Sequence, residues 1–310
     1  MKRIFIATSS FAQDSDEPLE MFNKYGYDVS MNKSNRKMNN DEITKNIKEC
    51  EGVIAGTEEY SKSLLDQATN LKVISRLGVG MDNIDLEYAK KLRIKVYKTK
   101  TNPSLAVSEL TLSLILDILR KVSLHDSRLK AGIWQKTMGS LLSGKTLGII
   151  GLGNIGKQLV RLTMGFDLTY LAHDMNVDED FAVKNNVKYC ELDELLAQSD
   201  ILSIHLNLTY DTKNLINFDA FRKMKPGAIL INTSRGGVIN EKSLIQALDS
   251  KLIAGAGLDV FQKEPYSGSL LEYENVVTTP HIGAYARELR MQMELEAAEN
   301  LISGLVNEGI

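Results

Sequence analysis

The chain has 310 residues, of which 43% are hydrophobic and 25% are charged, as in an ordinary globular protein with a substantial core. A formal net charge of −3 and a pI near 5.9 exclude the strong basic bias of proteins that bind nucleic acid or anionic membranes. The two cysteines have no metal-ligand spacing, and no apolar run reaches the length of a membrane span. We therefore expect a cytoplasmic protein of two domains that has no metal site.

Short apolar runs alternate with helical patterns through the first hundred residues. This alternation predicts an open parallel sheet covered by helices. Asp85 is the expected cap of one helix, and Ser61 could cap another. The expected strands are 3–8, 27–31, 52–57, 71–77 and 94–99, and the expected helices are 17–26, 40–50, a segment after Ser61, and 85–93.

A second strand series follows a long apolar-periodic helix expected at 104–122. Its strands are expected at 146–151, 168–174, 187–190, 201–208, 228–235, 253–260 and 275–280, and one long helix is expected at 286–306. Two such series predict an α/β protein with two doubly wound parallel-sheet domains, the smaller of which comes first. The last helix could cross back to the first domain.

The stretch "GIIGLGNIGKQL" contains a glycine pattern that follows a predicted strand and opens a predicted helix. In this context Gly151 permits a tight turn, Gly153 lets a pyrophosphate approach the backbone, and Gly156 lets the helix pack on the strand. Asp174 ends the next strand, where a carboxylate accepts the adenosine ribose hydroxyls and repels a 2′-phosphate. NAD is therefore the expected cofactor. The alternative is a glycine-rich turn that binds nothing.

Three polar residues stand just past neighbouring strand ends, where open α/β sheets bind ligands. Arg235 can bind a carboxylate in two-point fashion, and His281 can carry a proton near neutral pH. Glu264 can orient the imidazole and stabilise its cation. With NAD beside them, this set predicts oxidation of a 2-hydroxy acid. Taken singly, each could instead be an ordinary loop residue.

The other histidines are weaker candidates. His125 is expected on a helix surface, and His173 on the far side of the strand that leads to Asp174. His205 lies near a strand end. It could border the nicotinamide pocket or have a buried structural role, and the sequence leaves both roles open. Trp134 is expected to anchor packing or an interface.

Six stretches carry a resemblance over nearly the whole chain: "SRLGVGMDNID", "NPSLAVSELTL", "GKTLGIIGLGNIGK", "INTSRGGVINE", "GAGLDVFQKEP" and "TPHIGA". Together they resemble the D-isomer-specific 2-hydroxyacid dehydrogenase family. The resemblance implies a flavodoxin-like substrate domain of residues 1–99 plus 286–310, and a Rossmann NAD-binding domain of residues 100–285. It also implies a homodimer or larger homo-oligomer, built through the helix at 104–122 and the Trp134 segment.

The family's site residues can be carried over to matching positions. Its catalytic arginine, acid and histidine fall on Arg235, Glu264 and His281, with the histidine as general acid/base. Its substrate contacts fall on the backbone nest at Val79 and Gly80, and on Arg76 and Asn102. Its nucleotide contacts fall on Gly151, Gly153, Asn154, Ile155, Gly156, Asp174, Thr233 and Ser234, and toward the nicotinamide on Asp259, Gly283 and Ala284.

Within the family, the motifs resemble the phosphoglycerate-oxidising branch most closely, which implies a substrate of serine biosynthesis. The loop after the third strand departs from that branch, because Glu58 and Glu59 stand where a second phosphate-binding arginine is often found. Reduction of glyoxylate or hydroxypyruvate is therefore the alternative, and a non-catalytic NAD-sensing regulator is a third reading. The chain ends after the last helix, so a regulatory domain that binds serine is not expected.

Overall fold

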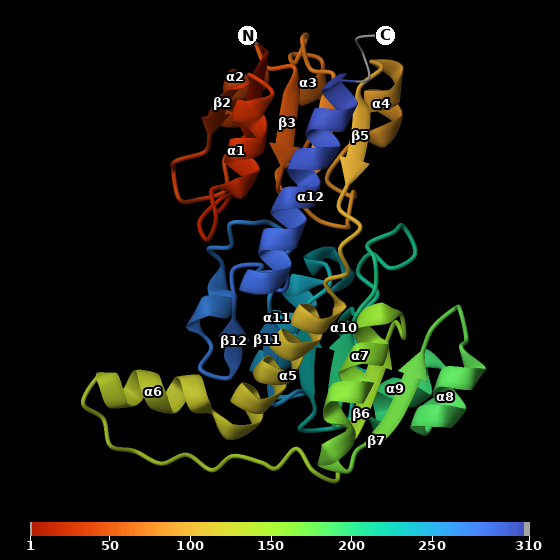
Figure 1. Ribbon diagram of the computed structural model, residues 1–310. Helices are drawn as coiled ribbons and strands as arrows, with labels where there is room; N and C mark the ends of the chain where they lie inside the picture. Colours follow the sequence, from red (N-terminus) through yellow and green to blue (C-terminus); the bar gives the residue numbers. More distant parts are fainter. Residues whose placement is uncertain (1, 307–310) are drawn as a thin grey trace. The chain divides into compact units, whose positions relative to one another are not determined.

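A computed structural model describes residues 2–306, which fall into two compact units (Figure 1). The first unit contains the residues up to Asn102 together with those from Tyr285 onward, and the second contains Pro103–Ala284. Each unit is built on its own parallel sheet flanked by helices. This confirms the predicted α/β fold with two doubly wound sheets.

The first unit has the strand order β2-β1-β3-β4-β5, which is the flavodoxin-like order of a doubly wound sheet. The strands are shorter than the apolar runs, because the ends of each run belong to turns at the sheet edges. The strands are β1 (Arg3–Ile6), β2 (Asp28–Met31), β3 (Gly52–Ala55), β4 (Val73–Arg76) and β5 (Lys95–Lys98). The helices are α1 (Glu17–Lys24), α2 (Asn40–Ile47), α3 (Lys62–Leu65), α4 (Leu86–Lys91) and α12 (Arg287–Val306).

The C-terminal helix α12 packs on this sheet, although more than 180 residues separate it from β5 along the chain. Gly52 leaves room for it, since a Cβ there would lie 2.9 Å from the Leu301 side chain. The buried Ser75 hydroxyl donates to the Ala297 carbonyl at 2.8 Å. The expected crossing of the last helix back to the first domain is therefore what the chain does.

Local capping decides where the short helices begin. The Asp85 side chain accepts from the Tyr88 amide at 2.9 Å and caps α4 as predicted. Ser61 stands at the N-cap position of α3, but its hydroxyl bonds to that of Ser63 at 3.0 Å and caps no backbone amide. The prediction for Ser61 was wrong because a second hydroxyl lies within its reach.

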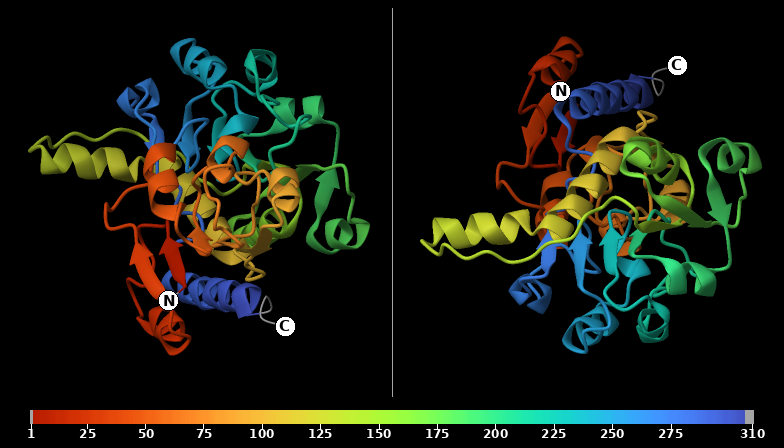
Figure 2. Two further views of the ribbon diagram at one scale, coloured as in Figure 1. Left: turned by 90° about the horizontal axis from the view of Figure 1, so that it is seen from above. Right: turned by 90° about the horizontal axis from the view of Figure 1, so that it is seen from below.

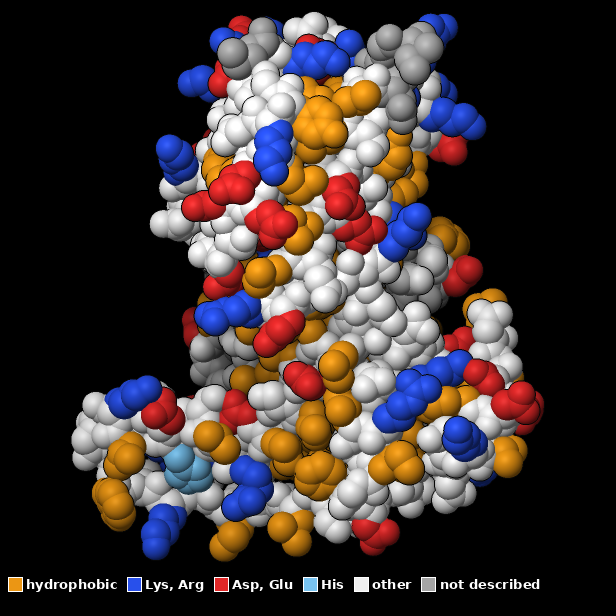
Figure 3. Space-filling model, viewed as in Figure 1, with side chains coloured by type: hydrophobic (Ala, Val, Ile, Leu, Met, Phe, Trp, Pro, Cys, Tyr) orange, Lys and Arg blue, Asp and Glu red, His pale blue; other side chains and the backbone are white. Residues whose placement is uncertain are grey.

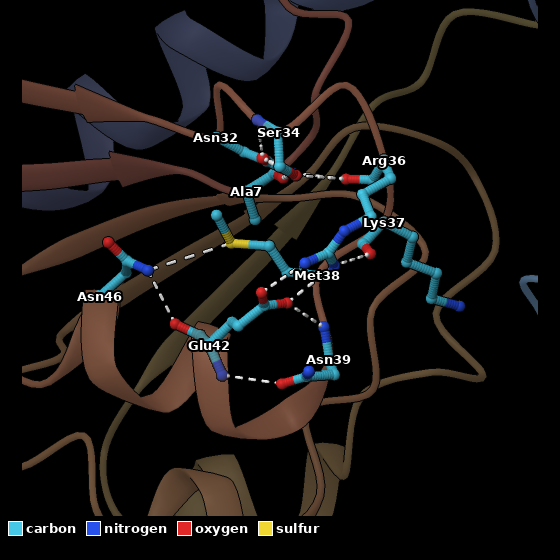
Figure 4. Close-up of polar contacts among 9 residues, drawn as sticks. All are labelled: Ala7, Asn32, Ser34, Arg36, Lys37, Met38, Asn39, Glu42 and Asn46. Carbon is cyan, nitrogen blue, oxygen red and sulfur yellow. Dashed lines mark hydrogen bonds and ion pairs between the residues drawn. The ribbon is translucent and has the colours of Figure 1, made fainter.

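The loop between β2 and α2 is closed by side chains (Figure 4). The Asn32 amide donates to the carbonyls of Ala7 and Arg36, and Asn39 and Glu42 form a reciprocal capping box at the start of α2. The hydrogen bond from Arg36 lowers the pKa of Glu42 to about 2. These contacts order a loop that lies beside the carboxyl end of β1.

The second unit has the strand order β12-β11-β10-β9-β6-β7-β8, which is the Rossmann order extended by one strand. The strands are β6 (Thr146–Ile150), β7 (Thr169–His173), β8 (Val187–Tyr189), β9 (Ile201–Ile204), β10 (Ile229–Asn232), β11 (Gly255–Leu258) and β12 (Val276–Thr278). The α-helices are α5 (Ser104–Arg120), α6 (Val122–Lys130), α7 (Asn154–Thr163), α8 (Glu179–Asn185), α9 (Leu192–Gln198), α10 (Phe218–Lys223) and α11 (Glu241–Asp249). Short 3₁₀ turns lie at Met164–Phe166, Gly236–Val238 and Ser269–Glu272.

The long helix predicted at 104–122 is observed as α5 and ends two residues earlier, at Arg120. Lys121 adopts a left-handed conformation with φ of +56°, which ends α5 and starts α6 in a new direction. Figure 2 shows α6 and the segment after it extending away from the rest of the second unit. Within the described residues, no helix combines the length and apolarity needed to span a membrane.

Candidate active site and dinucleotide site

The glycine loop connects β6 to α7, and each of its glycines has a separate steric reason. Gly151 has φ of +92°, and a Cβ there would lie 2.7 Å from the His205 carbonyl oxygen. A Cβ at Gly156 would lie 2.6 Å from the Gly151 carbonyl oxygen, so α7 can pack against the loop only if residue 156 has no side chain. Nothing lies within 4 Å of a Cβ built at Gly153, which leaves open space above the N-terminus of α7.

Asp174 follows β7 and braces the same loop. Its Oδ2 accepts from the Leu152 amide at 2.7 Å, and its Oδ1 accepts from the Asn176 amide at 2.8 Å. An open pocket of about 620 Å³ has both the loop and Asp174 in its wall. Free amides at a helix N-terminus, space above Gly153 and a carboxylate at the next strand end fit the pyrophosphate and ribose of a dinucleotide.

A turn built by Asn232 positions the residues after β10. The buried Asn232 Oδ1 accepts from the Ser234 amide at 3.0 Å, and its Nδ2 donates to the Arg235 carbonyl at 3.0 Å. The buried Thr233 hydroxyl meets that of Thr111 at 2.9 Å. Sequence reasoning missed Asn232, although an amide side chain at the end of an apolar strand is a signal of this kind of turn.

The loops that carry Arg235 and Glu264 are in backbone contact. A Cβ at Gly236 would lie 1.9 Å from the Phe261 carbonyl carbon, so these loops can meet only if position 236 is glycine. The Arg235 guanidinium donates to the Ser234 carbonyl at 2.8 Å. The Glu264 Oε1 accepts from the Phe261 amide at 3.2 Å, which fixes the carboxylate from its own loop.

His281 and Glu264 form the predicted pair. His281 Nδ1 lies 2.9 Å from Glu264 Oε2, and their side chains are 30% and 17% exposed. The bond orients the imidazole and leaves its Nε2 to face a reactant, while the exposure leaves the ring accessible. The geometry is that of a general acid/base held by a carboxylate.

Asp259 fixes the turn on which His281 stands. His281 has φ of +57°, which is uncommon for a residue with a side chain. Asp259 Oδ1 accepts from the Thr279 hydroxyl at 2.6 Å and the Ile282 amide at 2.7 Å, and its Oδ2 accepts from the Gly283 amide at 2.8 Å. Burial raises the pKa of this carboxyl, although the hydrogen bonds act in the opposite direction.

The other histidines have structural partners. His125 bonds the Lys121 carbonyl and accepts from the Thr137 amide, which ties the segment after α6 back to that helix. His173 Nδ1 lies 3.1 Å from the Cys190 carbonyl oxygen. His205 Nε2 lies 2.9 Å from the Ser203 hydroxyl, and its Nδ1 is buried without a partner among residues 2–306. Burial lowers the pKa of His205 to about 4.

The expected substrate contacts lie in the first unit. After β4, Gly78 has φ of +146°, and the amides of Val79 and Gly80 find no acceptor among residues 2–306. Arg76 is buried beneath this loop, where it donates to the Leu77 carbonyl. Asn102 is exposed at the end of the unit.

The loop after β3 adds a second buried charge to this unit. Glu58 is only 3% exposed and accepts from the Gly56 amide at 2.8 Å. Burial raises the pKa of the Tyr60 hydroxyl beside it; Glu58 acts in the same direction and Arg76 in the opposite one. Among residues 2–306, no group of three or more His, Cys, Asp or Glu side chains is arranged to hold a metal ion.

A Rossmann sheet with this glycine loop and acid defines a dinucleotide-binding domain. Residues 112–283 match the family model described as "D-isomer specific 2-hydroxyacid dehydrogenase, NAD binding domain". The chain is 38% identical over 272 residues to a hydroxypyruvate reductase of Thermotoga maritima, covering 86% of this chain and 88% of that protein. It is 34% identical over 294 residues to a D-3-phosphoglycerate dehydrogenase of Archaeoglobus fulgidus, covering 93% of this chain and 55% of that longer protein.

Solved structures agree with these similarities. A D-lactate dehydrogenase of Aquifex aeolicus, complexed with NAD and lactic acid, has a TM-score of 0.82 and 27% identity, with coverage of 99% of this chain and 96% of that one. The chain therefore belongs to the D-isomer specific 2-hydroxyacid dehydrogenases, which are NAD-dependent oxidoreductases. This confirms the family and the cofactor expected from the motifs.

Proposed function

We propose that this chain interconverts a D-2-hydroxy acid and its 2-keto acid, with Arg235, Glu264 and His281 as the catalytic set. The observation that carries the proposal is the 2.9 Å hydrogen bond between His281 Nδ1 and Glu264 Oε2, with His281 on a turn that Asp259 holds in place. An imidazole held in this way has one free nitrogen for proton transfer. The neighbouring Arg235 supplies a fixed positive charge for a carboxylate or a developing carbonyl oxygen.

The roles follow from these positions. Bound NAD supplies the hydride acceptor for C2 of the hydroxy acid. His281 Nε2 takes the hydroxyl proton, and Glu264 stabilises the imidazolium that results. Arg235 binds the substrate carboxylate and polarises the forming carbonyl. In the reverse direction, His281 returns its proton to the alkoxide oxygen.

The dinucleotide would be held by residues of the second unit. The pyrophosphate would meet the loop of Gly151, Gly153, Asn154, Ile155 and Gly156, and the adenosine ribose would meet Asp174. Thr233, Ser234, Gly283 and Ala284 would border the nicotinamide. Asp259 is 1% exposed and its oxygens are occupied, so we expect it to act there through the His281 turn.

The substrate carboxylate would bind the amides of Val79 and Gly80, which form a small anion-binding nest. We propose a short, unphosphorylated substrate such as hydroxypyruvate or glyoxylate. Arg76, the expected first phosphate ligand, is buried and engaged by the Leu77 carbonyl. Glu58 brings a buried negative charge to the loop that carries a phosphate-binding arginine in the phosphoglycerate branch.

D-3-phosphoglycerate is the second candidate, because the motif resemblance and the 34% identical relative from Archaeoglobus fulgidus favour it. It would place the chain in serine biosynthesis. If the first proposal is correct, NADH consumption with hydroxypyruvate and glyoxylate exceeds that with 3-phosphohydroxypyruvate by at least about 10-fold in kcat/KM. A preference for the phosphorylated acid would reverse the order of the two candidates. No turnover with any of these acids would favour a non-catalytic NAD-sensing regulator.

Charge variants of one loop test the role assigned to Glu58. Glu58→Gln keeps an acceptor for the Gly56 amide and removes the charge, so we expect kcat/KM for the phosphorylated acid to rise relative to hydroxypyruvate. Glu59→Gln is the matched control, since Glu59 is exposed on the same loop. Equal effects of the two variants would remove Glu58 from substrate selection.

We also propose a homodimer that uses the segment around α6. This helix has no buried residue, and Trp134 and Met138 after it are 83% and 90% exposed. Figure 3 shows apolar side chains on one face over α5 and α6. Light scattering should give twice the chain mass, and Trp134→Glu should reduce the measured mass toward that of one chain.

The thiols Cys50 and Cys190 are both free, which fits a reducing cytoplasm.

A further inference from the structure

The pocket beside the glycine loop contains a cation that the sequence pattern did not reveal. Its lining includes Lys157 together with four carboxylates, those of Asp174, Asp178, Glu179 and Asp180. Asp174 lies at the strand end that selects between the two nicotinamide dinucleotides in Rossmann domains. A lysine at such a place is the kind of residue that could bind a 2′-phosphate.

Lys157 is held by a partner from the next helix. It stands in the first turns of α7, and its ammonium forms an ion pair with Asp178. Its Nζ also lies 5.4 Å from the centre of the Phe181 ring. The Lys157 side chain is 23% exposed, so the ammonium is only partly solvated. These contacts fix the cation at the pocket wall and offset its charge.

Asp178 is itself fixed from both sides. Its Oδ1 accepts from the Phe181 amide at 3.0 Å and caps α8, while its own amide donates to the Tyr189 hydroxyl at 3.1 Å. The hydrogen bond from Lys157 holds the pKa of the Asp178 carboxyl below its usual range. The carboxylate is therefore ionised at neutral pH and pre-positioned to face the ammonium.

We propose that Asp178 is a second cofactor-selecting carboxylate: it occupies Lys157 and so removes the cation of this pocket that could bind a 2′-phosphate. Asp174 repels the phosphate directly, and Asp178 prevents the compensating contact. A 2′-phosphate entering here would have to break the Lys157–Asp178 pair and approach the remaining carboxylates. The inference rests on the proposed placement of the adenosine ribose beside Asp174.

Equilibrium binding of two nucleotide fragments tests the inference without turnover. Adenosine 5′-monophosphate reports the adenosine site itself, and adenosine 2′,5′-bisphosphate adds only the 2′-phosphate. Asp178→Asn keeps an oxygen to cap α8 and removes the charge. We expect calorimetry to show about 10-fold tighter binding of the bisphosphate by this variant, with the monophosphate changed by less than about threefold.

Two control variants separate the lysine from general charge. Glu179→Gln removes one charge from the same pocket without releasing Lys157, so its gain should be less than about threefold. In the double variant Asp178→Asn/Lys157→Met, the tighter binding of the bisphosphate should vanish. Equal gains in Asp178→Asn and Glu179→Gln, or a gain that survives in the double variant, would overturn the role of Asp178. Failure of the monophosphate to compete with NADH on the unmodified protein would instead overturn the placement of the ribose.

Discussion

The brace that Asp259 provides for the His281 turn makes a quantitative prediction. In Asp259→Asn, the Oδ1 contacts with Thr279 and Ile282 can persist. The new amide group faces the Gly283 amide, so a charge-assisted bond of 2.8 Å is lost and one buried N–H loses its acceptor. Such a loss costs about 1.5–3 kcal/mol.

This cost should appear in both stability and catalysis. We expect the free energy of unfolding to fall by about 2 kcal/mol, and kcat/KM to fall about 10- to 30-fold, since 1.4 kcal/mol corresponds to a factor of 10. The affinity for NADH should change by less than about threefold, because the glycine loop and Asp174 are untouched. Denaturant titration, steady-state kinetics and NADH fluorescence measure the three quantities.

Thr279→Val is the matched variant. It removes only the 2.6 Å hydroxyl bond and leaves both amides bonded to Asp259, so its loss in kcat/KM should be smaller than that of Asp259→Asn. Unchanged stability together with kcat/KM within twofold in Asp259→Asn would refute the brace. Loss of NADH affinity as large as the loss of kcat/KM would point instead to a direct contact between Asp259 and the nicotinamide.

The pH dependence of the free energy of unfolding supplies a second test of Asp259. Because the pKa of Asp259 is raised in the fold, the folded protein holds the proton to a higher pH than the unfolded chain does. Its contribution to stability therefore falls as pH rises from the unfolded pKa through the raised folded pKa, and Asn lacks this dependence. The free energy of unfolding of Asp259→Asn should consequently lack the fall with pH that the unmodified protein shows across that window.

Four further outcomes follow from the described contacts. His281→Asn should lower kcat by about 10²- to 10⁴-fold and leave the Kd of NADH within about threefold; substantial residual turnover would exclude His281 as the proton carrier. Glu264→Gln should lower kcat more than it lowers the affinity for NADH, because the imidazolium loses its counter-charge, and an unchanged kcat would remove Glu264 from the pair. Because the folded pKa of His205 is about 4, the unfolded chain takes up the proton first, and the free energy of unfolding should fall by at most about 3 kcal/mol between about pH 6.5 and pH 4. His205→Gln should flatten that part of the plot of stability against pH. Gly236→Ala should cost at least about 3 kcal/mol by denaturant titration, since its Cβ would overlap the Phe261 backbone; a loss below about 1 kcal/mol would show that the loops can separate.

The sequence alone determined most of the secondary structure and the family and cofactor of the chain. Each strand of both sheets falls within an apolar run identified beforehand, because buried parallel strands need continuous apolar residues. The glycine loop and Asp174 were readable because backbone sterics at a strand-to-helix turn dictate glycine in few patterns. Arg235, Glu264 and His281 could be proposed together as a catalytic set because parallel strands place their carboxyl ends on one edge.

Tertiary structure decided what depends on contacts between distant segments. The bounds of the separate helix α6 after Lys121 were not predicted, because none of its residues is buried and it therefore has no core-facing apolar pattern. The engagement of Arg76 and Glu58 within their own loops changed the substrate that we favour, since a sequence does not show whether a charged side chain is buried. Lys157 and Asp178 are 21 residues apart, and only the packing of α7 beside α8 brings their charges together. Local patterns fix backbone conformation, whereas pairing of charges requires the three-dimensional path of the chain.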